Sequence, residues 1–153
     1  MRNLFIALFF CSALQSIGQS SPDWLIEAKA IDPSNYYGVT VANGMIGLVS
    51  SPDPMRVKDV VLNGVYDYYQ RGRVSNILKT FNHANMNLDV DGRRIGMKDI
   101  SNYRQTLDMK KAILVTTFDV GDQLSVKHSM MALRHLPYTA MSIVELKAKK
   151  DVK

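Results

Sequence analysis

Oxygen-bearing side chains recur at every second position from Asn87 to Asp91, and Gly92 follows them. This spacing matches the first half of a calcium-binding loop, in which positions one, three and five supply ligands and position six is glycine. Position twelve of such a loop carries a bidentate carboxylate, but here it is Lys98. A β-hairpin that turns at Asp91 and Gly92 accounts for the same residues better.

The carboxylates of Asp89 and Asp91 are the one pair whose spacing suggests acid and base chemistry. Two residues apart on a strand, they would lie ~7 Å from each other, which is within the range of glycosidase carboxylate pairs. Carboxylates beside a turn are usually solvated, so we expect this pair to lie on the surface. The sequence therefore assigns no catalytic residue to the chain.

The three histidines, His83, His128 and His135, do not have the spacing of metal ligands, and the single cysteine, Cys11, lies near the N-terminus. We expect no metal site and no cofactor. His128 shares a face with apolar residues of a predicted strand, which favours a hydrogen-bonded core or interface histidine. The chain also has no Gly-x-Ser-x-Gly elbow and no phosphate-binding glycine loop.

Aromatic residues supply the candidates for ligand binding. Tyr66, Tyr68 and Tyr69 form a cluster that is either a carbohydrate platform or, more commonly, sheet packing. Trp24 is either a residue that stacks on a sugar or an anchor for the N-terminal arm. The substrate-binding residues stay unassigned at this point.

The elements that must position these residues are all predicted strands. The run from Ala112 to Phe118 is apolar and rich in β-branched residues, which predicts an interior strand with both faces covered. Asn43-Gly44 and Asn63-Gly64 each separate two strand-like runs and predict two hairpins. The remaining predicted strands are Asn85 to Val90, Gln123 to Ala132 and Thr139 to Lys149, and Ile95 to Ser101 crosses over to the stretch that begins at Tyr103.

Short strands at close spacing, with almost no helical periodicity after Gly38, predict an all-β fold, an antiparallel β-sandwich. The segment Arg71 to Asn85 has no strand pattern and is predicted to be a loop. A strand pattern continues to Lys149, close to the last residue, so we expect the sandwich over residues 36–153 to be incomplete.

The chain has 153 residues, 46% of them hydrophobic, and a formal net charge of +5. Its basic residues are scattered rather than clustered, which argues against a nucleic-acid partner. Residues 1–18 resemble a signal peptide, with Arg2 before the apolar run Leu4 to Phe10 and cleavage before Gln19. A lipoprotein signal has a small residue before its cysteine, and Phe10 before Cys11 is large, so we expect no stable membrane anchor. The signal peptide predicts an exported protein, periplasmic or extracellular. Residues 19–35 are predicted to be a lead-in to the sandwich.

Four segments in order resemble the N-terminal domain of glycoside hydrolase family 65, which includes maltose, trehalose and kojibiose phosphorylases and related α-glucosidases. The segments are Ala42-Asn43-Gly44-Met45-Ile46-Gly47, Asn63-Gly64-Val65-Tyr66-Asp67, the stretch Asn85 to Gly92, and Tyr103-Arg104-Gln105-Thr106-Leu107-Asp108-Met109.

The resemblance implies a partial super-sandwich that is joined, in the whole enzyme, to an (α/α)6 barrel with a glutamate as general acid. Glu27 and Glu145 lie in none of the matching motifs, so no catalytic residue is carried over. The implied partner is an α-linked gluco-oligosaccharide or disaccharide, cleaved by water or phosphate. We therefore expect an N-terminal scaffold, with the Arg71 to Asn85 loop near the barrel mouth. The alternative is a free-standing carbohydrate-binding sandwich without catalysis.

Overall fold

The computed structural model describes residues 22–67 and 76–153, which form strands, three short 3-10 helices and no α-helix. The strands are β1 (Leu25–Ala28), β2 (Thr40–Ala42), β3 (Ile46–Ser50), β4 (Val57–Asp67), β5 (Asn76–Lys79), β6 (Asp89–Val90), β7 (Arg93–Arg94), β8 (Ile100–Asp108), β9 (Ile113–Val120), β10 (Leu124–Ala132) and β11 (Ala140–Ala148). The 3-10 helices are η1 (Pro22–Trp24), η2 (Pro33–Asn35) and η3 (Met97–Asp99). In this part of the chain no helix is long and apolar enough to cross a membrane.

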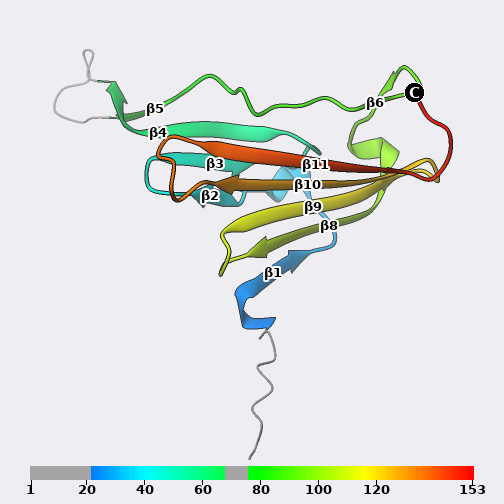
Figure 1. Cartoon of the computed structure of the whole chain (residues 1–153), viewed down its shortest axis with the longest axis horizontal. Helices are drawn as coiled ribbons and strands as arrows, with labels where there is room; N and C mark the ends of the chain where they lie inside the picture. The colour runs from blue at the N-terminus through cyan, green and yellow to red at the C-terminus, as the bar shows by residue number, and fades with distance from the viewer. Residues whose placement is uncertain (1–21, 68–75) are drawn as a thin grey trace, which may run out of the picture.

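Two antiparallel sheets make up the fold (Figure 1). The five-stranded sheet has the order β1-β8-β9-β10-β11, the four-stranded sheet has the order β2-β3-β4-β5, and β6 pairs with β7 alone. All strand pairs are antiparallel, which confirms the predicted all-β sandwich class. The predicted signal peptide lies outside the described residues.

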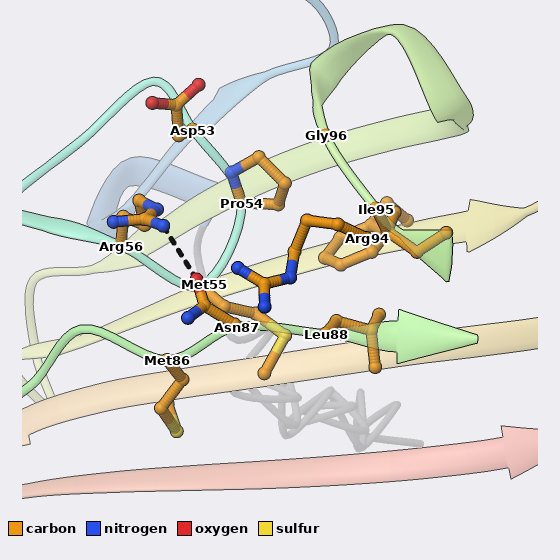
Figure 2. A pocket seen from close by; sticks show the side chains of 11 residues that line it. Asp53, Pro54, Met55, Arg56, Met86, Asn87, Leu88, Arg94, Ile95 and Gly96 are labelled. Carbon is orange, nitrogen blue, oxygen red and sulfur yellow. Dashed lines mark hydrogen bonds between the residues drawn. The ribbon is translucent and has the colours of Figure 1, made fainter. Parts of the chain in front are cut away.

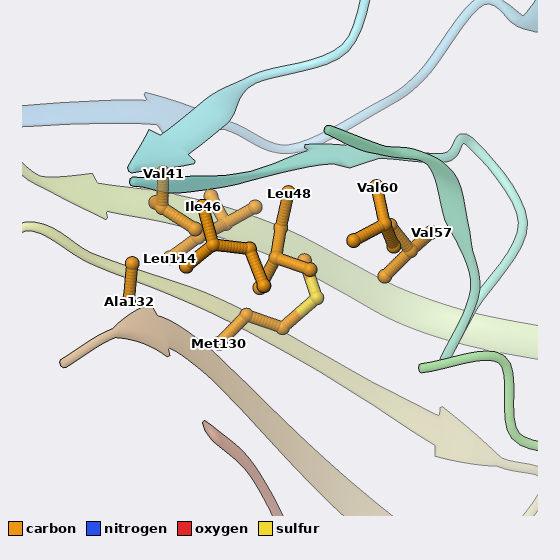
Figure 3. Packing of buried hydrophobic residues seen from close by; sticks show 8 residues of the cluster. All are labelled: Val41, Ile46, Leu48, Val57, Val60, Leu114, Met130 and Ala132. Atoms are coloured by element: carbon orange, nitrogen blue, oxygen red, sulfur yellow. The ribbon is translucent and has the colours of Figure 1, made fainter. Parts of the chain in front are cut away.

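One half of the core lies between the two sheets, and we call it the sheet-on-sheet half (Figure 3). Strands β2, β3 and β4 of the four-stranded sheet face β9 and β10 of the five-stranded sheet. A fully buried aliphatic side chain contributes about 1.5–3 kcal/mol to stability. The buried members are Val41, Ile46, Leu48, Val57, Val60, Leu114, Met130 and Ala132.

The other half of the core lies under a segment with little regular structure, and we call it the segment-covered half. Here Phe118 and Val126 of the five-stranded sheet pack under Met55, Val90 and Ile95. Burial alternates along residues 81–90, so the extended segment before β6 presents every second side chain inward. Both halves share the inner face of β9 and β10.

Strand β9 is the middle strand of the five-stranded sheet, as the run from Ala112 to Phe118 predicted. Its buried residues alternate with half-buried ones, because side chains on a strand point to opposite faces. Leu114 and Phe118 are buried in the core, whereas Ile113 and Val115 are half-buried on the outer face. The prediction that both faces are covered therefore holds fully for the inner face only.

The first predicted hairpin is present, with β2 and β3 as its arms. The backbone N–H of Asn43 donates to Ile46 O at 3.2 Å, which leaves Gly44 and Met45 as the two central residues. Gly44 has a φ of 88°, while the Asn43 side chain accepts from the N–H groups of Met45 and Ile46, both at 3.0 Å. Asparagine therefore caps this turn, and glycine supplies the positive φ.

The second predicted hairpin is wrong, because β4 continues through Asn63-Gly64 from Val57 to Asp67. Gly64 has a φ of 84°, and the pairing of β4 with β5 shifts register between Val61 and Tyr66. The Asn63 backbone N–H donates to Met45 O at 2.8 Å, so Asn63 extends the pairing with β3 beyond its ladder. The positive φ serves a bulge here rather than a reversal.

The predicted loop from Arg71 to Asn85 is only partly irregular. Residues 71–75 lie outside the described residues, and Asn76–Lys79 form β5 on the edge of the four-stranded sheet. Thr80 N–H donates to Val60 O at 2.9 Å, and the chain then leaves the sheet as the extended segment. The loop prediction is therefore wrong for β5, whose pairing partner is supplied by β4.

Candidate functional site

A pocket of about 210 Å³ opens in the segment-covered half, between the turn that follows β3 and the β6-β7 hairpin (Figure 2). We call it the Arg56–Arg94 pocket. Its floor is apolar, and two guanidinium groups, one amide and one carboxylate stand among its lining residues. These are Asp53, Pro54, Met55, Arg56, Met86, Asn87, Leu88, Arg94, Ile95, Gly96 and Phe118.

The turn between β3 and β4 positions the first side of the pocket. Ser51 N–H donates to Arg56 O at 3.3 Å, which closes this turn. Met55 adopts a φ of 59°, a left-handed conformation that is uncommon for a side chain of this kind. Its carbonyl accepts from Met86 N–H at 3.1 Å, so a backbone hydrogen bond joins the two walls of the pocket.

Polar contacts fix the two arginines. Arg56 Nη2 donates to Asn87 Oδ1 at 2.6 Å, and this contact bridges the pocket. Arg94 Nε and Nη2 both donate to the Asp89 carboxylate, with the second contact at 3.3 Å. The bidentate arginine holds the pKa of Asp89 below its usual value, because it stabilises the charged carboxylate.

Asp89 and Asp91 do not form the carboxylate pair that the sequence suggested. Asp91 and Gly92 have φ values of 51° and 76° and form the turn, so Asp91 leaves the strand alternation. Its carboxylate accepts from Lys153 N–H and from Gln123 Nε2, both at 2.9 Å. The predicted hairpin is confirmed, and Asp91 fastens the chain near Lys153 to this hairpin.

The histidines stand apart from one another. His128 is buried at 2% exposure, and its Nε2 lies 3.1 Å from Ser142 Oγ, which confirms the prediction of a hydrogen-bonded core histidine. Burial lowers the pKa of His128, because it disfavours the charged ring. His83 stands edge-on to Phe81, and His135 is exposed. Within the described ranges no group of three or more His, Cys, Asp or Glu could hold a metal ion.

Trp24, the one aromatic candidate whose side chain lies within the described residues, does not line the Arg56–Arg94 pocket. Trp24 is 52% exposed next to β1, and its carbonyl accepts from Met109 N–H at 2.9 Å. Its role as a sugar-stacking residue or an anchor stays a prediction. The side chain of Tyr66, and all of Tyr68 and Tyr69, lie outside the described residues, so the predicted carbohydrate platform stays untested.

Sequence reasoning missed the pocket, although it singled out Asn87 for a different reason. Arg56 and Asn87 are far apart in the chain and meet only because the extended segment crosses the β3–β4 turn. The alternation along residues 85–90 predicted which side chains point inward, including Met86 and Leu88. No local pattern indicates what those side chains face.

Comparison with known proteins identifies the fold's family. Residues 38–152 match the model of the N-terminal domain of glycosyl hydrolase family 65. The chain belongs to this family. It is 53% identical over 129 residues to a kojibiose hydrolase of Mucilaginibacter mallensis, which covers 84% of this chain and 19% of that protein. It is 42% identical over 149 residues to a kojibiose hydrolase of Flavobacterium johnsoniae, covering 97% of this chain and 22% of that protein.

This family 65 chain therefore spans about a fifth of the length of the curated relatives that it matches. The motifs that carried the resemblance occupy structural positions. Asn43 caps a turn, and Asp108 Oδ1 accepts from Lys111 N–H at 3.0 Å in the β8–β9 turn. Tyr103 and Leu107 pack against the core, and burial raises the pKa of Tyr103 above its usual range.

Proposed function

We propose that this chain is the N-terminal scaffold domain of an exported family 65 enzyme that hydrolyses α-glucosides. The match of residues 38–152 to the family's N-terminal domain carries the proposal. In this proposal residues 1–18 are a signal peptide, residues 19–35 a lead-in, and residues 36–153 a part of the sandwich. The catalytic domain is a different part of the longer enzyme.

The carboxyl groups of the described residues support a scaffold role. A general acid of a glycosidase needs a raised pKa, so that it keeps its proton near neutral pH. Hydrogen bonds and neighbouring cations instead lower the pKa of five described carboxyl groups. These groups are Asp32, Asp89, Asp108, Asp119 and Asp122.

The two glutamates also support this role. Glu27 lies 3.5 Å from Arg104 Nη1, and Glu145 lies 2.7 Å from Lys127 Nζ. Both face away from the core, on the outer face of the five-stranded sheet, because their neighbours in register alternate with the buried residues. Neither glutamate lies beside the Arg56–Arg94 pocket.

The proposed substrate is an α-linked gluco-disaccharide or oligosaccharide, with kojibiose as the first compound to test. Two relatives of 53% and 42% identity are kojibiose hydrolases, which favours hydrolysis over phosphorolysis. No cofactor is part of the proposal, since inverting glycoside cleavage needs only an acid, a base and water.

Activity measurements on two lengths of chain test this function. The 153-residue chain is expected to release no glucose from kojibiose, maltose or trehalose. The longer enzyme, in which the proposed catalytic domain follows this chain, is expected to hydrolyse kojibiose. Glucose release by the 153-residue chain alone would contradict the scaffold role, and an inactive longer enzyme on all three sugars would contradict the substrate class.

Export has a separate test. The protein recovered from the periplasm or culture medium is expected to begin at Gln19, and its intact mass would show the loss of residues 1–18. Recovery of the protein in the cytoplasm with Met1 still present would contradict the export proposal without touching the scaffold role.

The alternative function is a free-standing carbohydrate-binding module. The Arg56–Arg94 pocket is the observation that favours it, because it combines an apolar floor with hydrogen-bonding groups. This alternative requires the 153-residue chain to fold cooperatively as a monomer and to bind sugar by itself. Aggregation through the open edges of the sheets would speak against it.

A further inference from the structure

We propose that the Arg56–Arg94 pocket binds one ring of a neutral, polyhydroxylated ligand, such as a pyranose unit of a sugar. This inference goes beyond the scaffold role, because a scaffold needs no ligand of its own, and it deepens the alternative function of carbohydrate binding by naming its site and its ligand. It uses the charges, hydrogen bonds and apolar lining of the pocket and not the family match.

The charges around the pocket argue for a neutral ligand. Arg56 and Arg94 bring two positive charges, while Asp53 at the rim and Asp89 behind Arg94 bring two negative charges. An oxyanion site would need a surplus of positive charge to offset the loss of hydration of the anion. Because the four charges balance, a phosphate or carboxylate gains little here.

The polar groups match hydroxyls, which both donate and accept hydrogen bonds. The Asp89 contacts use Nε and Nη2 of Arg94, which leaves Nη1 as a donor. Arg56 and the Asn87 amide supply further N–H donors, and their mutual bond at 2.6 Å holds them in place. Hydroxyl oxygens of a ligand can accept hydrogen bonds from these N–H groups, while Asp53 stands at the rim of the pocket.

The floor of the pocket suits the C–H face of a sugar ring. Pro54, Met55, Met86 and Leu88 line it together with Phe118, and all present carbon or sulfur atoms. A pyranose has polar edges and an apolar face, so it can lie on this floor while its hydroxyls meet the arginines and Asn87.

The size and rigidity of the pocket limit the ligand. Pockets for drug-sized ligands measure about 300–1,000 Å³, so a volume of about 210 Å³ suits a single ring. The backbone hydrogen bond from Met86 to Met55 and the left-handed Met55 residue fix the walls before any ligand arrives. A pre-formed site loses less conformational freedom on binding.

NMR titration of the full 153-residue chain, labelled with ¹⁵N, tests the inference. D-glucose and kojibiose are expected to give saturable shifts of the Asn87 and Gly96 amides, whereas sodium sulfate gives none at these amides. The Arg56→Met variant keeps the length of the side chain but removes the guanidinium. It is expected to weaken sugar binding about tenfold or more, because a charged hydrogen bond is lost.

Arg134→Met is the matched control, because Arg134 is an exposed arginine outside the pocket. It is expected to bind sugar as the unchanged chain does. If Arg56→Met does not fold by circular dichroism, Asn87→Ala replaces it with the same expected weakening. Saturation by sulfate in place of sugar would overturn the inference in favour of an oxyanion site. No saturable shift with either sugar, or undiminished binding by the folded variant, would overturn it as well. Neither result bears on kojibiose hydrolysis by the longer enzyme.

Discussion

Both halves of the core pack on the inner face of the five-stranded sheet, but different parts of the chain pack against them. In the sheet-on-sheet half, the five-stranded sheet meets β2, β3 and β4, whose backbones are joined by ladders. In the segment-covered half, the same sheet meets an extended segment that is held by isolated hydrogen bonds rather than by a ladder. Val57 N–H donates to Asn85 Oδ1 at 2.7 Å, and Ile95 N–H donates to Leu88 O at 2.9 Å.

This difference explains where the pocket lies. Two regular sheets pack closely because their side chains interdigitate over the whole contact. An extended segment crosses the sheet with side chains from one face only, and it leaves a recess where it passes the β3–β4 turn. A regular half thus supports an irregular half that can present ligand-binding groups.

The largest expected effect lies in the sheet-on-sheet half. Leu48→Ala removes one of the most deeply buried side chains, at 1% exposure, and is expected to cost about 2–5 kcal/mol of the free energy of unfolding. Urea denaturation measures this loss. Leu146→Ala, at a site that is 56% exposed, is the control and is expected to change stability by no more than about 0.5 kcal/mol. Equal losses in both variants would contradict the assigned core.

Asn85→Ala tests one of the isolated hydrogen bonds that hold the extended segment in the segment-covered half. It removes the acceptor for Val57 N–H, and we expect a loss of about 1–2 kcal/mol. Hydrogen exchange should speed up at the amides of Val57 and Met86, while the amides of β9 and β10 stay protected. Asn35→Ala, at an exposed residue of η2, is the matched control. Loss of protection throughout the sheets would show that the two halves unfold as one.

Acid should weaken the protein through Asp119, which lies in β9 directly after Phe118. Hydrogen bonds from Asn102, Ser125 and Lys149 hold the pKa of Asp119 at about 2, against an ordinary value of 3.8. The native state therefore binds this proton less readily than the unfolded state. The stabilisation is complete above about pH 4 and is lost as the pH falls towards 2, by on the order of 1–2 kcal/mol.

Unfolding midpoints in urea between pH 5 and 2 measure this acid effect. The Asp119→Asn variant cannot ionise at this position, so we expect it to be less stable at neutral pH and to have a shallower acid dependence. An unchanged acid dependence in this variant would place the titrating group elsewhere.

The smallest expected effect concerns the bulge in β4. Gly64→Ala forces an alanine to a φ of 84°, and we expect a loss of about 1 kcal/mol. Gly47→Ala in β3 is the control, because an added methyl there meets the nearest atoms at 3.7 and 3.9 Å and the φ is not positive. A neutral Gly64→Ala variant in a thermal melt would contradict the strained bulge.

Much of the fold is predictable from local patterns. An apolar run rich in β-branched residues identified the middle strand, and Asp91-Gly92 identified a hairpin turn, because both signals depend on neighbours in the chain. The location of β5 was missed, since its pairing with β4 is not encoded in its own four residues. The pocket was missed for the same reason, because Arg56 and Asn87 meet only through the path of the extended segment.

The two Asn-Gly dipeptides show the limit of what the sequence alone determines. The sequence determined the family, the all-β class and the need for a positive φ at Gly44 and Gly64, since only glycine adopts it without strain. Tertiary structure decided what each positive φ does. Beside Asn43 the chain reverses, whereas Asn63 bonds to Met45 O and Gly44 O and β4 continues. A backbone angle is a local property, but its consequence depends on the strand that lies alongside.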